Sequence, residues 1–202
     1  MARISSIKAA LLEEAILYLL EDSCYTTVQS VPNINRRDPY LENAPNGICV
    51  LGRGEKHQID AIADYVFPPP FSNPLRLLCE AKYSEGNPVG ISIIRNAVGV
   101  KKDVEEYFRP SSNRRTSRYH YQYAVISSSG FTVNAQNYAY AQDIYLLDLS
   151  ADIYESIIID VIDLYVETVI VQPLKDKGHR IKWNTDINID LKYLRETFRG
   201  TL

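Results

Sequence analysis

The sequence is poor in cysteine, and its cysteines show no spacing typical of a bridge or a metal site. There are three, Cys24, Cys49 and Cys79, an odd number without any C-x-x-C spacing. This pattern argues against both a disulfide framework and a zinc knuckle. The cysteine usage favours a reducing compartment, and we expect the protein to be cytoplasmic.

Long hydrophobic runs are missing too. The longest apolar region, YESIIIDVIDLYVETVIV at 154–171, is interrupted by Asp160, Asp163 and Glu167, so it falls short of a membrane span. A lysine and two glutamates interrupt the first apolar stretch, so the chain does not start like a signal peptide. We expect neither secretion nor a membrane segment.

An excess of positive charge is also absent, since the net charge is −3. Binding to nucleic acid would therefore need a local concentration of basic residues. Residues 107–123, YFRPSSNRRTSRYHYQY, provide one, with four arginines, no acids and aromatic flanks. We expect Arg114, Arg115 and Arg118 to contact DNA phosphates, and a solvated loop between a helix and a strand is the alternative.

The composition that is present is typical of one soluble globular domain. With 202 residues, 46% of them apolar and 23% charged, the chain can bury a sizeable core, whereas two full domains would be a tight fit. We predict a core formed by residues 1–150 and a C-terminal helical extension, residues 151–202, that packs on the same domain.

The first half of the chain contains two predicted helices and a predicted hairpin. Helical periodicity favours helices over 6–21 and 89–108, and residues 32–47, rich in Pro, Asn and charge, predict a long loop before a short strand at 48–52. The stretches HQIDAIADYVF and LRLLCEAKY predict two strands, and the PPPFSNP between them cannot continue either one. These two strands are therefore predicted to form an antiparallel hairpin with a wide turn.

The second half predicts a parallel pair of strands. YAVISSS and DIYLLDL are strand-like, and the helix between them opens at Thr132, so a crossover joins parallel neighbours. The SSSGFT segment could offer backbone amides to a phosphate, or it could be an ordinary capped connection. The tail predicts one acidic helix, and its TVIVQP segment stays unassigned.

One acid in the first helix falls on the apolar side. At 100° per residue the centre of the apolar stripe is formed by Ala9, Leu12, Ile16 and Leu20. Glu13 falls on that stripe, whereas Glu14 points away from it. A carboxylate directed at a core either finds a partner, such as Arg95, or serves a site.

The hairpin carries a candidate catalytic constellation. Glu80 and Lys82 are two residues apart in a strand, so they project to the same side, and Asp60 is expected on the neighbouring strand. Two converging carboxylates with room for water and a phosphate oxygen form the kind of site that Mg²⁺ prefers. Beside such an ion, Lys82 would position the attacking water or stabilise developing negative charge.

These residues resemble a known family. The order of a helix-borne Glu13, then Asp60, then Glu80-x-Lys82 resembles the PD-(D/E)xK nuclease superfamily, whose members hydrolyse phosphodiester bonds in DNA with Mg²⁺. The run YAVISSSGFTVNAQNYAYAQDIYLLDL is similar to the strand-helix-strand that follows the ExK strand in Mrr-like restriction endonucleases. The similarity covers residues 6–149, with Ile59 where the superfamily name has proline.

The resemblance implies both a fold and roles for individual residues. The fold would be α/β and restriction-endonuclease-like, with a mixed central sheet flanked by helices. Asp60 and Glu80 would bind the metal together with the backbone carbonyl of Ala81, Lys82 would be the catalytic lysine, and Glu13 would be an accessory catalytic carboxylate. The cofactor would be Mg²⁺, with Mn²⁺ as an alternative, and the substrate would be DNA.

We therefore expect a metal-dependent DNA endonuclease that acts in restriction or in defence against foreign DNA. One site cuts one strand, so a double-strand cut would need a homodimer, and residues 152–171 would either supply its interface or cover the sheet. Two alternatives remain open. One is a structure-selective repair nuclease or junction resolvase, and the other is a noncatalytic DNA- or protein-binding module on the same fold.

Two further residues compete for places in the site. Asp64 lies on the same strand face as Asp60 and is a rival metal ligand, although it is nearer the turn. His57 could act as a base, but a lone histidine at the start of a strand is usually only partly exposed, and we leave it out of the catalytic set.

Overall fold

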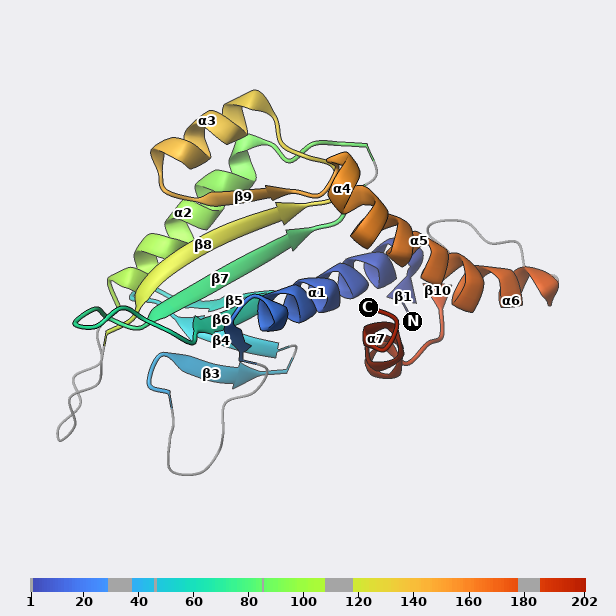
Figure 1. The fold of residues 1–202 in the computed structure, drawn as a ribbon, viewed down its shortest axis with the longest axis horizontal. Coiled ribbons are helices and arrows are strands. Elements are labelled where there is room, and N and C mark those ends of the chain that lie inside the picture. Colours follow the sequence, from blue (N-terminus) through green and yellow to red (C-terminus); the bar gives the residue numbers. More distant parts are fainter. Residues whose placement is uncertain (1, 29–37, 46, 85, 108–117, 178–185) are drawn as a thin grey trace.

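The structure is a computed structural model that describes residues 2–28, 38–45, 47–84, 86–107, 118–177 and 186–202. Its centre is a five-stranded mixed sheet (Figure 1). In spatial order the strands are β2 (Tyr25–Thr27), β6 (Ala61–Tyr65), β7 (Leu75–Lys82), β8 (His120–Ser127) and β9 (Tyr145–Asp148). Strand β6 runs antiparallel to both β2 and β7, and β7, β8 and β9 are mutually parallel. The predicted hairpin and the predicted parallel pair are both confirmed.

Helices cover both faces of this sheet (Figure 1). Helix α1 (Ile4–Asp22) packs on one face, and α2 (Ile91–Glu105) and α3 (Val133–Ala141) pack on the other, which confirms the mixed sheet flanked by helices. Side chains alternate along β7, so Cys79 joins the core beneath α1 and Leu78 joins the core beneath α2. By the same alternation, Glu80 and Lys82 project toward the α2 face.

A smaller sheet lies beside the central one and corrects the loop prediction. Its strands are β3 (Leu41–Ala44), β4 (Gly47–Leu51) and β5 (Lys56–Gln58), all antiparallel. The predicted loop at 32–47 therefore contains a strand, although residues 29–37 and 46 lie outside the described part. Leu41 and Val50 pack into the core beneath α2, and this burial accounts for strand pairing in a stretch rich in turn-forming residues.

The C-terminal region begins as a run of helix that packs against α1. It comprises α4 (Asp152–Tyr154), the π-helical turn η1 (Glu155–Ile159), α5 (Asp160–Val166), a second π-helical turn η2 (Glu167–Val171) and α6 (Gln172–Asp176). The unassigned TVIVQP segment is thus helical, because Ile170 and Val171 are buried in the core beneath α1 and this packing outweighs their strand propensity. Among the described residues, no helix is long and apolar enough to cross a membrane.

The last helix lies beside the first. Strand β10 (Asp186–Ile187) pairs with β1 (Ala2–Arg3), and α7 (Leu191–Arg199) follows at once. The Asp190 carboxylate caps α7 by accepting the backbone amides of Lys192 and Tyr193. Leu194 and Phe198 then bury one face of α7 in the core that contains α1. Figure 1 shows both ends of the chain close together at this place.

The β6–β7 hairpin is fixed at its turn end by a buried arginine. The Arg76 side chain, only 1% exposed, donates from Nε to Asp64 Oδ1 at 2.7 Å and from Nη2 to Asp38 Oδ2 at 2.7 Å. Its guanidinium also lies over the ring of Tyr119, 3.8 Å from the centroid. Asp64 is paired with Arg76 in the strand register, so these contacts fix the alignment that places Asp60 and Glu80 at the other end.

We predict that Arg76→Met lowers the free energy of unfolding by about 3 kcal/mol, because it leaves two partly buried carboxylates without their cation. Urea unfolding measures this loss. The matched control is Lys56→Met, which breaks an exposed pair with Glu42 and should cost less than about 1 kcal/mol. Equal losses in the two variants would contradict this role of Arg76.

Candidate active site

Asp60 lies where the chain passes from the small sheet to the central sheet. The predicted single strand HQIDAIADYVF is in fact two, because β5 pairs with β4 and β6 pairs with β7. Asp60 occupies the bend between them, and its Oδ2 accepts the backbone amide of Ala81 at 2.8 Å. Since Ala61 pairs with Cys79 in the ladder, Asp60 lies one step beyond it, beside Glu80.

Glu80 is held by two neighbours on the α2 face of the sheet. Lys82 Nζ lies 2.7 Å from Glu80 Oε1, so the two side chains lie on the same side, as the strand spacing predicts. The hydroxyl of Tyr123, on the parallel neighbour β8, donates to Glu80 Oε2 at 3.0 Å. Tyr123 is 2% exposed, and burial followed by the Glu80 charge raises its pKa, so it remains a hydroxyl donor.

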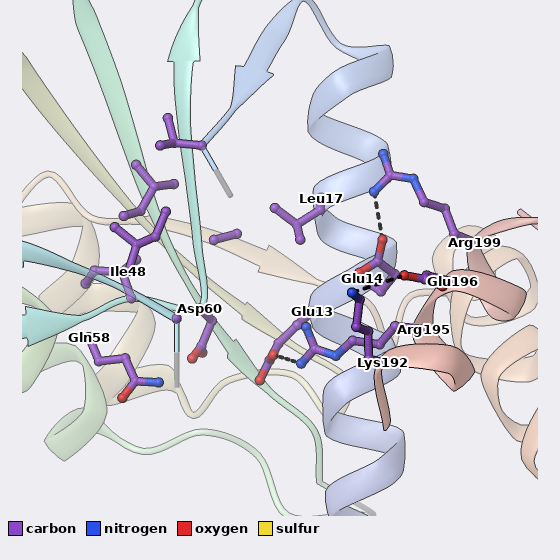
Figure 2. Close-up of a pocket in the computed structure, with 15 residues that line it drawn as sticks. Glu13, Glu14, Leu17, Ile48, Gln58, Asp60, Lys192, Arg195, Glu196 and Arg199 are labelled. Carbon is purple, nitrogen blue, oxygen red and sulfur yellow. Dashed lines mark hydrogen bonds and ion pairs between the residues drawn. The ribbon is translucent and has the colours of Figure 1, made fainter. Parts of the chain in front are cut away.

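Glu13 approaches Asp60 from α1. Figure 2 shows the carboxylates of Glu13 and Asp60 facing each other across a pocket, with Arg195 of α7 reaching Glu13. An ion pair joins Arg195 Nη2 to Glu13 Oε2. The arginine partner that the sequence suggested, Arg95, instead lies over the ring of Tyr138.

The expectation for Glu14 is wrong. It was expected to point away from the apolar stripe, yet it is only 8% exposed and pairs with Arg199 at 2.7 Å. The reason is that α7 covers this side of α1 with arginines. A helical projection of α1 alone contains no information about Arg199, which lies 185 residues farther along the chain.

Two cavities meet at Asp60. One, of about 490 Å³, lies between α1, α7 and the start of β6, and its wall includes Glu13, Asp60 and Arg195. The other, of about 240 Å³, has Asp60, Glu80 and Lys82 in its wall together with Asn96 of α2 and Tyr123. Asp60 therefore borders the space of Glu13 on one side and the space of Glu80 on the other.

Asp60, Glu13 and Glu80 form a corner between the two cavities, and burial makes this corner unfavourable for negative charge. It is the main cause that raises the pKa of Asp60, and the Glu80 carboxylate raises it further, while the Ala81 amide and Lys82 oppose the shift. Burial likewise raises the pKa of Glu13, against the opposing effect of Arg195. Carboxylates that are costly to ionise in isolation are favoured partners for a cation.

The donors at this corner fit a small hard cation. In a strand the amide and carbonyl of one residue point to the same neighbour, so the Ala81 carbonyl faces the side on which Asp60 accepts the Ala81 amide. Among the described residues, no three Asp, Glu, His or Cys side chains lie together as a metal-binding group. The oxygen donors available to an ion are then the carboxylates of Asp60 and Glu80 and the carbonyl of Ala81. Mg²⁺ accepts so few protein ligands because it retains several waters.

Comparison with known proteins identifies the fold but no family. Neither a family model nor a curated protein sequence matches the chain. Among solved structures, a protein of unknown function, AF1548, is 20% identical with a TM-score of 0.52, and the match covers 95% of this chain and 78% of that one. At this identity the likeness concerns the fold alone.

A second solved structure is the DNA modification-dependent restriction endonuclease AspBHI. It is 13% identical to this chain with a TM-score of 0.41, and the match covers 96% of this chain and 35% of that one. A likeness this weak does not bear on the function of this chain.

The rival residues have structural partners elsewhere. Asp64 is bound to Arg76 at the turn end of the hairpin, away from Glu80. His57 does line the cavity beside Glu80, but its Nε2 lies 2.8 Å from Asp103 Oδ2 on α2, and this bond is the main cause that lowers the pKa of Asp103. The Asp103 carboxylate also accepts the amide of Gly54, so His57 helps to fasten the loop before β5.

Of the three arginines expected to contact DNA, the described part of the chain includes Arg118. Arg114 and Arg115 lie outside the described residues. Arg118 donates to the carbonyl of Glu105 at 2.6 Å and so caps the C-terminal end of α2. In the SSSGFT segment, Ser127 and Ser128 donate to nearby backbone carbonyls and Thr132 accepts the amide of Ala135, as in an ordinary capped connection.

Sequence reasoning missed two residues of this corner, Tyr123 and Arg195. Tyr123 begins the predicted strand YAVISSS, but the sequence did not predict that this strand pairs with β7, and it is this pairing that places Tyr123 near Glu80. No local signal marks Arg195, since it belongs to a helix that was not predicted individually.

We predict that Asp60→Asn raises the melting temperature at neutral pH in EDTA. Folding raises the pKa of Asp60, so its ionised form weakens the fold above that pKa, whereas asparagine is neutral and still offers an oxygen to the Ala81 amide. The gain should vanish at about pH 3, below the usual pKa of aspartate. As a control, Asp160→Asn on an exposed site should change stability by less than about 0.5 kcal/mol.

Proposed function

We propose that the protein is a Mg²⁺-dependent DNA endonuclease of the PD-(D/E)xK superfamily, similar to Mrr-like restriction enzymes and acting in restriction or defence. The main support is the strand register that brings Asp60 beside Glu80, with Lys82 2.7 Å from the Glu80 carboxylate. The order of these residues in the sequence is that of the superfamily, and their arrangement in a mixed sheet between helices is compatible with it.

In this proposal Asp60, Glu80 and the Ala81 carbonyl hold the ion, with Mn²⁺ as an alternative to Mg²⁺. When bound, the ion activates a water and offsets charge on the phosphate. Tyr123 holds one oxygen of Glu80 from the buried side, which fixes the direction of the carboxylate. Lys82 lies at the rim, 35% exposed, where its ammonium can reach both a water and a phosphate oxygen.

Hydrolysis then requires little chemistry from the protein itself. The water oxygen forms a bond to phosphorus while the bond from phosphorus to the leaving sugar oxygen breaks. Lys82 positions the water and stabilises the charge that develops on the phosphate oxygens. Glu13 is an accessory carboxylate on the opposite side of Asp60, in the larger cavity.

The proposal also includes a homodimer, because cutting both strands requires two such sites. In the region 152–171, the side chains of Ile158, Ile162 and Val166 are buried against α1 within the chain, so they are not available to a second copy. Exposed apolar side chains of the same region, Ile153 at 68% and Leu164 at 66%, leave one of its faces available.

Plasmid cleavage tests the function. We predict Mg²⁺-dependent nicking or cutting by the wild-type protein, none in EDTA, and a loss of about 10²- to 10³-fold in rate for Lys82→Ala, the usual effect of removing one group that stabilises transition-state charge. The matched control is Lys102→Ala, an exposed lysine on α2 that should leave the rate unchanged.

The proposal is wrong if the plasmid cleavage rate is the same for the wild type and Lys82→Ala, and the same with Mg²⁺ and with EDTA. A parallel arm with branched DNA separates the restriction role from a structure-selective one. If wild-type protein binds DNA and shows no metal-dependent cleavage, the noncatalytic alternative holds.

A further inference from the structure

The ion pair between Glu13 and Arg195 connects the first helix of the chain with the last. Arg195 Nη2 contacts Glu13 Oε2 across 182 residues of sequence, and both side chains are partly buried, with 32% and 26% of their surface exposed. Figure 2 shows the guanidinium reaching Glu13 on the side of the pocket where Asp60 lies. A helix that was expected only to cover the domain thus supplies a charged group to the cavity wall.

A second arginine of α7 provides a natural comparison. Arg199 lies one turn farther along and pairs with Glu14 at 2.7 Å, and it also pairs with Glu21. Neither of these glutamates belongs to the candidate constellation. The two arginines therefore join the same two helices through the same kind of contact, but only Arg195 does so through a residue that faces Asp60.

Three carboxylates, those of Glu13, Asp60 and Glu80, line the two cavities, and two of them are in ion pairs, Glu13 with Arg195 and Glu80 with Lys82. Asp60 lies between the cavities of Glu13 and Glu80, and Lys82 is engaged with Glu80. Without Arg195, the Glu13 side chain would lose the ion pair that holds its Oε2. It would then be free to turn away from the repulsion of Asp60 or to take up a proton.

We propose that Arg195 is a positioning residue of the site, which acts through Glu13 by holding that carboxylate in place opposite Asp60. This proposal rests on the function proposed above. It gives α7 a role in the reaction beyond packing, because the accessory carboxylate keeps its place only while α7 is docked on α1. Arg195 itself need not touch DNA.

The test compares Arg195→Gln with Arg199→Gln, and includes Arg195→Lys and Glu13→Gln. We expect Arg195→Gln to lower kcat for plasmid cleavage by about 10- to 100-fold, the usual effect of losing a partner that orients a site group. The KM for DNA should stay near the wild-type value. Arg195→Lys, which keeps the charge, should recover most of the rate, and Arg199→Gln should keep the wild-type rate.

A double-mutant cycle separates action through Glu13 from an independent effect. The variant with both Glu13→Gln and Arg195→Gln should be no slower than Glu13→Gln alone, because the arginine then has nothing left to position. Thermal unfolding in EDTA accompanies each variant. Arg199→Gln removes the contacts to Glu14 and Glu21, so it should lose at least as much stability as Arg195→Gln, which removes the contact to Glu13.

A readout without cleavage completes the design. The stabilisation of the wild-type fold by Mg²⁺ alone, followed as melting temperature against ion concentration, should need about 10-fold more ion in Arg195→Gln and no more in Arg199→Gln. If the wild type cleaves but Arg195→Gln cleaves as Arg199→Gln does, or the double variant is additively slower, the positioning role is wrong. If the wild type neither cleaves nor is stabilised by Mg²⁺, the proposed function and this role both fail.

Discussion

The hydrogen bond from the Ala81 amide to Asp60 is the contact on which the candidate site depends most. It is made where β6 has not yet begun to pair, so a side chain takes the place that a backbone carbonyl would occupy farther along the ladder. The bond fixes Asp60 at the boundary between the two sheets, and the adjacent Glu80 and Lys82 follow from strand alternation. One amide therefore determines how the acids from two strands are placed relative to each other.

The buried surroundings of that contact have two opposing effects. They raise the pKa of Asp60 and of Glu13, so the site opposes the stability of the metal-free fold. The rest of the hairpin offsets this through Arg76, whose bonds to Asp38 and Asp64 secure the opposite end. Proteins commonly offset an unfavourable site by compensating contacts elsewhere in the fold.

The sequence predicted the parts of the fold that depend on local pattern. The first helix, the β6–β7 hairpin, the parallel β8–β9 pair and the Thr132 cap all follow from periodicity, proline placement and capping, which act over a few residues. The same holds for the closeness of Glu80 and Lys82. What the sequence could not predict depends on distant packing. Strand β3 in a polar stretch, the helical TVIVQP segment and the burial of Glu14 are all decided by partners far along the chain.

The pairing of β1 with β10 and of α1 with α7 has a consequence for how the molecule is made. Residues 2–3 and 186–187 form one two-stranded ribbon, and Glu13 pairs with Arg195, which is synthesised 182 residues later. During synthesis on a ribosome the central sheet can form early, while the wall that α7 contributes exists only once residues 191–199 have emerged from the exit tunnel. A nascent polypeptide that has not yet released α7 would thus carry Asp60, Glu80 and Lys82 without this wall of the pocket.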